Sequence, residues 1–532
     1  MDILRGNKRF STFLVFLGFF IFVCVLNWDA RYEKPVWDTA AGVFSPAIYL
    51  YETGFDFYGL LEEPGFRQAG PNVHVYTPIT IVTAAVMWLF NGDTEFVYLS
   101  LHLIQFFLTG LVLAVVFNLS RSIFGIYTSL FVTAAIMLFP PFLIQSRYMY
   151  MEIGGSLCVI LAFSNWVKQS YFWAAIAAIA ACMVKSSGLP IILCLSLLFM
   201  LEKDGRTRRV FYVAMMVILG VGIELLRWMQ KANTASVNNA DYIGYLIHQF
   251  HGRLSQTPDF YLILLFLVIG GWWYLLKNRD TFKRKFILDG QQDGDLDFER
   301  RVLLGGVLMI SAFVGFIAVV PLSGMEFYPL TRYYIWIWPV MVITLVALIL
   351  ISFRSGELQQ ENKNGGLAVK VFVKIIIVVM IGFFWSNKSG EYYPNYGKDI
   401  TAFSIAERSM EYKSFNEMQS ALIKSAEGIN DRNVYLNLFD TFYTSSPIMG
   451  YIDHEKENFK YIVTYHDNPA DLREYPDNFA LVLSNVSHGG QYMSALMHQA
   501  LRAPDMYEVK ILDDYNIDGF TGSIVGISKL HE

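Results

Sequence analysis

Long runs of apolar residues alternate with short polar connectors over residues 1–386, and the rest of the chain is polar throughout. A helix that crosses a membrane needs about 20 mainly apolar residues, with a usable range of about 17 to 25. By this measure the pattern predicts about eleven spans, at residues 10–27, 97–117, 125–143, 152–167, 171–184, 188–201, 209–227, 259–276, 302–320, 333–352 and 369–386. The predicted fold class is therefore mostly α, with a polytopic membrane helix bundle at 1–386 and a separate domain at 387–532.

The polar segment 387–532 contains two kinds of apolar pattern. Short apolar stretches between turn residues are typical of strands, whereas apolar residues three or four apart are typical of amphipathic helices. Strands are predicted at Val434–Phe439, Tyr461–Tyr465, Phe479–Leu483, Val509–Leu512 and Ser523–Ile527, and helices at Ile405–Ala426 and Gln491–Leu501. We therefore expect a small α/β domain.

The distribution of Lys and Arg predicts how the bundle is oriented. Short cytoplasmic loops of membrane proteins are enriched in these residues. If the N-terminus is cytoplasmic, the loops on its side carry about three times as many Lys and Arg residues as the short loops on the other side. An odd number of spans then places the C-terminal domain outside. The predicted localisation is a multi-pass protein of a bacterial cytoplasmic (inner) membrane.

The first outer loop, residues 28–96, is too long for a simple connector. Its second part, residues 78–90, is apolar but short. If this part crossed the membrane, Arg121 and the basic segment 202–209 would move to the outside. We therefore expect a helix that lies in the membrane interface.

Composition and charge agree with this picture and exclude some functions. The chain of 532 residues is 54% hydrophobic and 16% charged, whereas soluble domains are about 25% charged. The net charge of −5 gives no reason to expect a nucleic-acid partner. All four cysteines lie in apolar runs, so no disulfide framework is expected.

Several polar residues of the first outer loop could carry chemistry. Asp38 follows Trp37 near the membrane surface, where a partly desolvated carboxylate is a stronger proton acceptor and suits a general base. A solvated loop residue or a helix N-cap is the alternative reading. His74 and Tyr76 precede Pro78, near the expected start of the interfacial helix, where they could face a lipid phosphate; the alternative is a surface His and an interfacial anchoring Tyr.

Further candidates lie in the later outer loops. Glu152 begins a span and follows Arg147, and a carboxylate beside an apolar helix is costly unless it has a partner or a role. Its alternative role is a charge at a helix N-terminus. Lys185 can bind phosphate as a point charge or extend its ammonium to the interface. Arg332, followed by Tyr333, suits bidentate phosphate recognition or simple interfacial anchoring.

The order of these features resembles the C-type (GT-C fold) membrane glycosyltransferases, in the branch of the protein O-mannosyltransferases and the lipid A aminoarabinose transferase. The resemblance covers about residues 10–350, and its specificity comes from the order of short motifs. These motifs are Trp37-Asp38, His74 with Tyr76 and Pro78, Phe90-Asn91-Gly92, Arg121 to Gly125, Ser146-Arg147 with Glu152, Lys185 to Gly188, and Arg332-Tyr333. The chain departs from the family pattern at Thr39, where Glu is frequent.

The resemblance implies a glycosyltransferase that moves a hexose or pentose from a polyprenyl-phosphate donor. The acceptor would be a lipid, glycan or protein hydroxyl at the outer membrane face. Asp38 and Glu152 would be the catalytic carboxylates, and His74, Lys185 and Arg332 would bind the donor phosphate. Trp37, Tyr76, Arg147 and Tyr333 would line the substrate pocket. No cofactor is assigned. Two carboxylates on the same side of the membrane could bind a divalent metal, although the sequence shows no clustered set of metal ligands.

Two other classes remain as alternatives. A transporter or lipid flippase places charges inside its spans near the midplane, often within inverted repeats. Here the charges Glu224 and Lys374 lie near helix ends, and no repeat is visible. A non-enzymatic scaffold would not need a long first loop with Asp and His residues.

The charge bias makes the orientation testable. A reporter enzyme fused after Glu532 should be active only outside the cytoplasm, and one fused near Arg206 only inside it, because the Lys- and Arg-rich loops stay cytoplasmic. Activity measurements on intact cells distinguish the two sides. The reversed pattern would contradict the placement of every candidate residue above.

Overall fold

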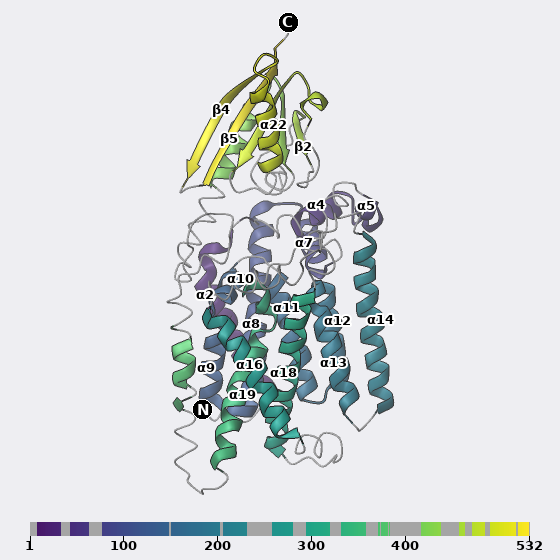
Figure 1. The fold of residues 1–532 in the computed structure, drawn as a ribbon, viewed down its shortest axis with the longest axis vertical. Helices are drawn as coiled ribbons and strands as arrows, with labels where there is room; N and C mark the ends of the chain where they lie inside the picture. The colour runs from purple at the N-terminus through teal and green to yellow at the C-terminus, as the bar shows by residue number, and fades with distance from the viewer. Residues whose placement is uncertain are drawn as a thin grey trace. The chain divides into compact units, whose positions relative to one another are not determined.

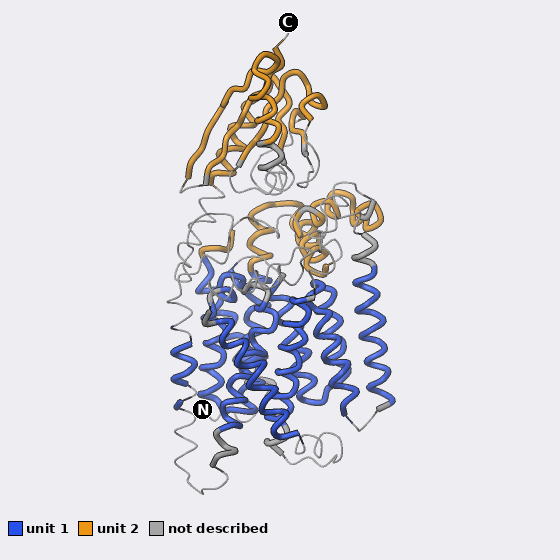
Figure 2. Tube along the Cα trace, in the orientation of Figure 1, with its two compact units in different colours: residues 1–28, 103–229, 234–403 blue, residues 29–102, 230–233, 404–532 orange. Residues whose placement is uncertain are grey.

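The structure is a computed structural model of the chain, and the chain forms two compact units (Figure 2). It describes residues 8–32, 34, 43–62, 77–147, 151–202, 206–230, 258–279, 294–319, 331–357, 371–372, 374–380, 382, 417–437, 457–462, 471–484, 490–517 and 520–530. Unit 1 comprises residues 1–28, 103–229 and 234–403, and unit 2 comprises 29–102, 230–233 and 404–532. Each unit is described by itself below.

Unit 1 is a bundle of helices (Figure 1). Its described helices are α2 (Lys8–Asn27), most of α8 (Thr94–Phe124), α9 (Ile126–Met137), α10 (Pro140–Arg147), α11 (Met151–Val167), α12 (Tyr171–Val184), α13 (Leu189–Leu201), α14 (Arg206–Gln230), α16 (Pro258–Lys277), α18 (Gly294–Val319) and α19 (Trp338–Glu357). The tightest helix pair is α11 with α12, and α18 packs against α13, α16 and α19. The predicted mainly helical fold is confirmed.

Several of these helices can cross a membrane. Within the described residues, four helices are long and apolar enough by length and composition, at Thr12–Ala30, Thr94–Phe124, Phe260–Lys277 and Phe298–Ala318. Shorter apolar helices occupy four further expected positions, at Glu152–Val167, Tyr171–Val184, Ser186–Leu201 and Trp338–Ser352. The chain is an integral membrane protein, and the count of about eleven spans stays a prediction.

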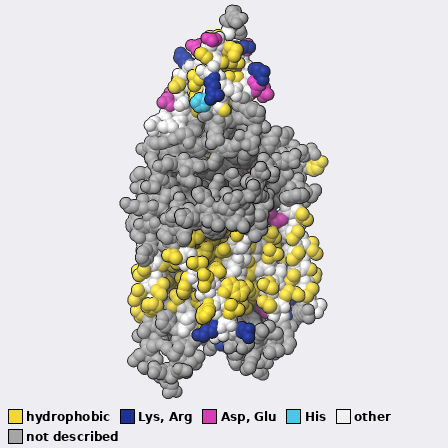
Figure 3. Space-filling view, viewed as in Figure 1, with side chains coloured by type: hydrophobic (Ala, Val, Ile, Leu, Met, Phe, Trp, Pro, Cys, Tyr) yellow, Lys and Arg dark blue, Asp and Glu magenta, His cyan; other side chains and the backbone are white. Residues whose placement is uncertain are grey.

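On the face drawn in Figure 3, hydrophobic side chains gather over the described helices of the bundle. Helix α16 shows the pattern clearly, because one side of it is buried against its neighbours and the other exposes large apolar side chains, namely Leu262, Leu265, Phe266, Ile269, Trp273 and Leu276. A continuous apolar surface of this kind is rare on soluble monomers and marks contact with lipid or another protein. The exposed apolar side chains of α16 are therefore suited to contact with lipid.

The predicted span 125–143 is divided in two. Gly125 alone joins α8 to α9, and its φ of +79° lies in a region that favours glycine. Helix α9 ends at Met137, and α10 begins at Pro140 with its axis bent by 73°. Proline lacks an amide hydrogen and restricts the residue before it, so Pro140 and Pro141 favour a new helix over a continued one.

Among the described residues of unit 2 within 29–102 are the short helices α4 (Ser45–Glu52), α5 (Phe57–Glu62) and α7 (Pro78–Leu89). Helix α7 corresponds to the predicted interfacial helix. It begins with Pro78, and the Thr77 hydroxyl accepts from the Thr80 amide at 3.4 Å. Helix α4 packs against α7, and the ring of Phe44, just before α4, lies 6.0 Å from that of Tyr98 in α8.

The C-terminal part of unit 2 contains a five-stranded mixed sheet of order β2-β1-β3-β5-β4. Its strands are β1 (Asn433–Asn437), β2 (Phe459–Ile462), β3 (Asn478–Ser484), β4 (Tyr507–Ile517) and β5 (Phe520–Lys529). The first three are parallel, whereas β5 is antiparallel to β3 and β4. Helix α22 (Gly490–Arg502) packs on β3, β4 and β5. The strands predicted at 479–483, 509–512 and 523–527 and the helix at 491–501 are confirmed. Of the strands predicted at 434–439 and 461–465, the described residues 434–437 and 461–462 form strands, and of the helix predicted at 405–426, the described part forms a helix at 417–427.

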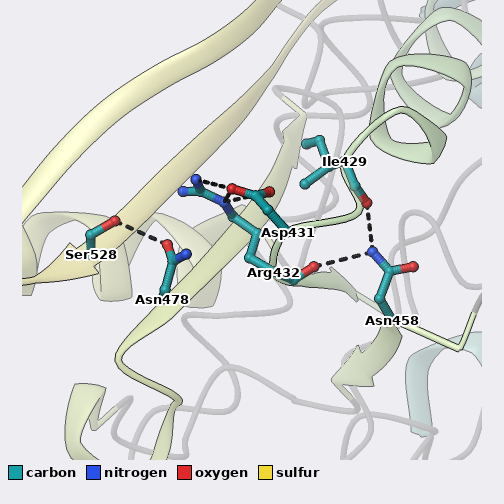
Figure 4. A network of polar contacts seen from close by, with 6 residues as sticks. All are labelled: Ile429, Asp431, Arg432, Asn458, Asn478 and Ser528. Atoms are coloured by element: carbon teal, nitrogen blue, oxygen red, sulfur yellow. Dashed lines mark hydrogen bonds and ion pairs between the residues drawn. The ribbon is translucent and has the colours of Figure 1, made fainter.

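Polar side chains connect the strand ends of this sheet (Figure 4). The Asn458 amide donates to the carbonyl oxygens of Ile429 at 2.6 Å and Arg432 at 3.1 Å, which joins the entry of β2 to that of β1. Ser528 donates to the Asn478 side chain at 3.0 Å and connects β5 to β3. These contacts keep the strands in register.

An ionic cluster closes one end of the unit 1 bundle, around Glu202 at the end of α13. The buried Glu202 carboxylate accepts from Arg209 at 3.1 Å, from Arg301 at 3.2 Å and from the Tyr171 hydroxyl. Its backbone oxygen also accepts from Arg209 at 2.6 Å. The cluster therefore fixes the ends of α12, α13, α14 and α18 to one another.

Removal of this carboxylate should destabilise the bundle. Glu202→Ala leaves the buried Arg209 and the partly buried Arg301 without their shared carboxylate, and loss of one partner of a buried ion pair typically costs about 3–5 kcal/mol. Thermal unfolding of the purified protein in detergent should occur at a clearly lower temperature. The exposed neighbour Arg208 provides the control, since Arg208→Ala should change stability by about 0.5 kcal/mol or less. Equal stability of the two variants would contradict the role of Glu202.

Candidate functional site

The candidate site is built on the antiparallel hairpin of α11 and α12. The helices have 17 and 14 residues and are joined by residues 168–170. Gln169 takes a left-handed conformation with φ 61°, and the Ser170 amide donates to the Asn165 oxygen at 2.8 Å, which reverses the chain sharply. Since the helices are of similar length, the beginning of α11 and the end of α12 meet at the same end of the hairpin.

This geometry brings two predicted site residues together. Glu152 is the second residue of α11, Lys185 follows the last residue of α12, and the Lys185 Nζ lies 3.7 Å from the Glu152 Oε1. The carboxylate side chain is 4% exposed and the lysine side chain 17%. Opposite charges at this distance attract each other strongly where little water separates them. The two residues are therefore an ion pair, an arrangement that the sequence alone did not predict.

A tight turn presents Lys185. Its backbone is extended (φ −162°, ψ 158°), and the 3-10 turn Ser186–Gly188 follows and leads into α13. The Gly188 amide donates to the Lys185 oxygen at 2.9 Å. A Cβ on Gly188 would lie 2.3 Å from the Ala181 carbonyl carbon, so the turn packs on the last turn of α12 only with glycine at this position.

Helix α10 carries Arg147, which is buried. A helix of eight residues has little stability of its own, and two buried side chains from other helices hold its C-terminal end. The Asn27 amide donates to the Ser146 hydroxyl at 3.3 Å, and the Gln105 amide donates to the Gln145 backbone oxygen at 2.7 Å. Asn27 and Gln105 therefore fix the position from which Arg147 projects.

The segment with Arg332 packs next to this hairpin. Residues Thr331–Trp336 form the 3-10 helix η7, which packs against α10 and α11. The Trp336 ring occupies the space beside Gly155, where a Cβ would lie 2.3 Å from the ring. Aromatic contacts hold the entry of α19, with the rings of Phe139 and Trp338 4.1 Å apart and those of Phe260 and Tyr334 5.1 Å apart.

The structure therefore describes part of the predicted site. Glu152, Lys185 and Arg147 belong to one end of the same hairpin and its neighbour, and the backbone of Arg332 and Tyr333 lies in η7. The side chains of Arg332 and Tyr333, and all of Trp37, Asp38, His74 and Tyr76, lie outside the described residues. Among the residues that are described, no group of three or more His, Cys, Asp or Glu side chains could hold a metal ion.

Sequence reasoning missed the residues that support the site. Asn27 and Gln105 lie in apolar segments, and a tryptophan at position 336 is typical of a residue that anchors a helix at the membrane interface. A buried amide in a span is itself a signal, because polar groups in membranes need partners. Which partner each amide has could be found only from the structure.

Comparisons with known proteins complete the description. No family model and no curated protein matches the sequence. In fold the chain is similar to ArnT from Cupriavidus metallidurans: the apo structure has a TM-score of 0.48, 12% identity and 98% coverage of both chains. For the form bound to undecaprenyl phosphate, the TM-score is 0.47 and the identity 13%, over 96% of this chain and 97% of that chain. The chain is also similar to the archaeal oligosaccharyltransferase AglB from Archaeoglobus fulgidus, in complex with an inhibitory peptide and a dolichol-phosphate. The TM-score is 0.39 and the identity 13%, over 84% of this chain and 64% of that chain. The structures to which the chain is similar are thus membrane glycosyltransferases of the GT-C fold.

Proposed function

We propose that this protein is a membrane glycosyltransferase that moves a sugar from a polyprenyl-phosphate donor to an acceptor hydroxyl at the outer face of the membrane. The observation that carries the proposal is the buried pair of Glu152 and Lys185 at one end of the α11–α12 hairpin. Arg147 and the segment with Arg332 belong to elements packed at this hairpin. Charged groups inside a membrane bundle are rare and usually functional.

The chemistry of this end of the bundle suits a lipid-linked phosphate. Lys185 follows the end of α12 in an extended conformation, and its Nζ lies 3.7 Å from the Glu152 carboxylate. An ammonium has three donors and binds phosphate as a point charge, whereas a guanidinium such as that of Arg332 binds it in a bidentate manner. Cations from two elements would neutralise the phosphate where the headgroup region meets the hydrocarbon.

The proposed reaction is an inverting transfer. Asp38 removes the proton from the acceptor hydroxyl, and the oxygen attacks the anomeric carbon. The bond from that carbon to the phosphate oxygen breaks, and its electron pair leaves with the polyprenyl phosphate. Lys185, Arg332 and His74 stabilise the charge of this leaving group, which needs no proton at neutral pH. Glu152 holds Lys185 in place.

The acceptor is a hydroxyl of a lipid, glycan or protein presented outside the cytoplasmic membrane. A transporter or flippase of the same lipid is the second candidate. It would move the lipid across the bilayer without breaking the sugar–phosphate bond, so the release of free polyprenyl phosphate distinguishes the two.

Loss of the cations should weaken the use of the donor. Charge-assisted hydrogen bonds contribute about 1.5–3 kcal/mol each, so Lys185→Ala or Arg332→Ala should weaken donor use about tenfold or more. The measurement is the dependence of transfer on the concentration of a polyprenyl-phosphate sugar in detergent. Lys277→Ala, at the end of α16, is the matched control and should behave as wild type.

Lys185→Ala also leaves Glu152 without its ion pair, which would destabilise the bundle. The double variant Lys185→Gln/Glu152→Gln removes both charges together and should fold, yet still use the donor poorly. If transfer by this variant and by Arg332→Ala depends on donor concentration as in the wild-type protein, Lys185 and Arg332 are interfacial anchors and do not bind the donor phosphate.

Loss of the base should stop transfer without loss of the fold. Asp38→Asn is a loop substitution, for which the stability change is usually about 0.5 kcal/mol or less. Loss of a general base lowers the rate by about 10²–10⁴-fold. Initial rates at saturating donor test this expectation, with Asp29→Asn in the same loop as the control. A rate within a few-fold of wild type would assign the base to another residue.

A further inference from the structure

Several buried polar atoms of α11 have no hydrogen-bond partner among the residues that the structure describes, and two of them lie near the beginning of the helix. They are the second carboxylate oxygen of Glu152, Oε2, and the hydroxyl of Ser156. Glu152 is 3% exposed and Ser156 is fully buried. Buried polar atoms without a partner are uncommon in native proteins, because each costs about 1–3 kcal/mol, and each requires an explanation.

The two atoms belong to one site because of their spacing. Residues four apart on a helix lie on the same face, about 5–6 Å apart between Cβ atoms. Ser156 is therefore one turn further along α11 than Glu152, on the same side. A helical serine often donates to the carbonyl oxygen one turn earlier, as Thr109 does to Gln105 at 2.9 Å, but the Ser156 hydroxyl forms no such bond. A single ligand could satisfy both atoms.

The charge of Glu152 limits what this ligand can be. Lys185 lies 3.7 Å from Oε1, so a phosphate would be drawn to the lysine and repelled by the carboxylate. Oε2 accepts only from a hydrogen-bond donor, whereas the Ser156 hydroxyl can donate or accept. The ligand group at this position is therefore neutral or cationic and carries an O–H or N–H.

We propose that Glu152 Oε2 and Ser156 Oγ form a subsite for a hydroxyl or amino group of the sugar that is transferred. The subsite rests on the proposed function, since it assumes that a lipid phosphate occupies the neighbouring Lys185. It makes Glu152 a specificity-determining residue, with one oxygen on Lys185 and the other on the sugar. A site that hydrogen-bonds a substrate hydroxyl rejects analogues without it, because its buried polar atoms are then left unpaired.

The test uses the full chain in nanodiscs and four lipid probes. These are undecaprenyl phosphate and undecaprenyl phosphate linked to a hexose, an N-acetylhexosamine or an aminopentose. Equilibrium dissociation constants are measured for each, and the quantity of interest is the affinity for the best sugar-bearing lipid divided by that for undecaprenyl phosphate. The wild-type protein should prefer at least one sugar-bearing lipid.

Glu152→Gln and Ser156→Ala should each lower this ratio about tenfold, the effect of losing one hydrogen bond to a charged group or leaving one buried group unpaired. Ser164→Ala, a buried serine further along the same helix, is the matched control and should leave the ratio unchanged. Lys185→Gln should weaken the binding of all the probes together. Thermal unfolding of each variant confirms that it is folded.

A wild-type protein that binds undecaprenyl phosphate but prefers no sugar-bearing lipid would overturn the subsite. So would a ratio that neither Glu152→Gln nor Ser156→Ala changes, which would assign an ordered water to these two atoms. A wild-type protein that binds none of the four lipids would instead overturn the proposed function on which the subsite rests.

Discussion

A charge buried among apolar helices needs an opposite charge or a ligand, and this requirement governs the end of the bundle where α11 begins. Glu152 meets it through Lys185, 3.7 Å away. The pair can form because two helices of similar length are joined by a sharp reversal, and because Gly188 lets the following turn pack on α12. Gly155 leaves room for Trp336, so η7 packs beside the same carboxylate-bearing turn.

Buried carboxylates lie at both ends of this group of helices, and their hydrogen bonding differs. Glu202 accepts from two arginines and a tyrosine, so its oxygens are satisfied within the protein. Glu152 has one oxygen at Lys185 and a second with no partner among the described residues. A fully satisfied carboxylate joins helix ends, whereas a partly satisfied one is suited to bind a ligand. This contrast separates a structural cluster from a candidate site without reference to any relative.

Much of the architecture could be predicted from the sequence, because apolar periodicity follows directly from burial in lipid or in a sheet. The strands β3, β4 and β5, the helix of 490–502 and most described helices of unit 1 are examples. The bend between α9 and α10 could not be read from hydropathy, since the apolar run continues through Pro140 and Pro141. At the site, residue types indicated Glu152 and Lys185 as candidates, but their contact depends on the length of the hairpin. Ser156 was missed because a serine in a span carries no signal until its partners are known.

In the proposed reaction, Lys185 is the cation that receives the donor phosphate. An experimental structure of the protein in a nanodisc with undecaprenyl phosphate tests this claim directly. We expect the phosphate within about 3 Å of the Lys185 Nζ, with Glu152 still paired to the same lysine. Phosphate bound at the other cluster, beside Arg209 and Arg301, with Lys185 in contact with Glu152 alone, would contradict it.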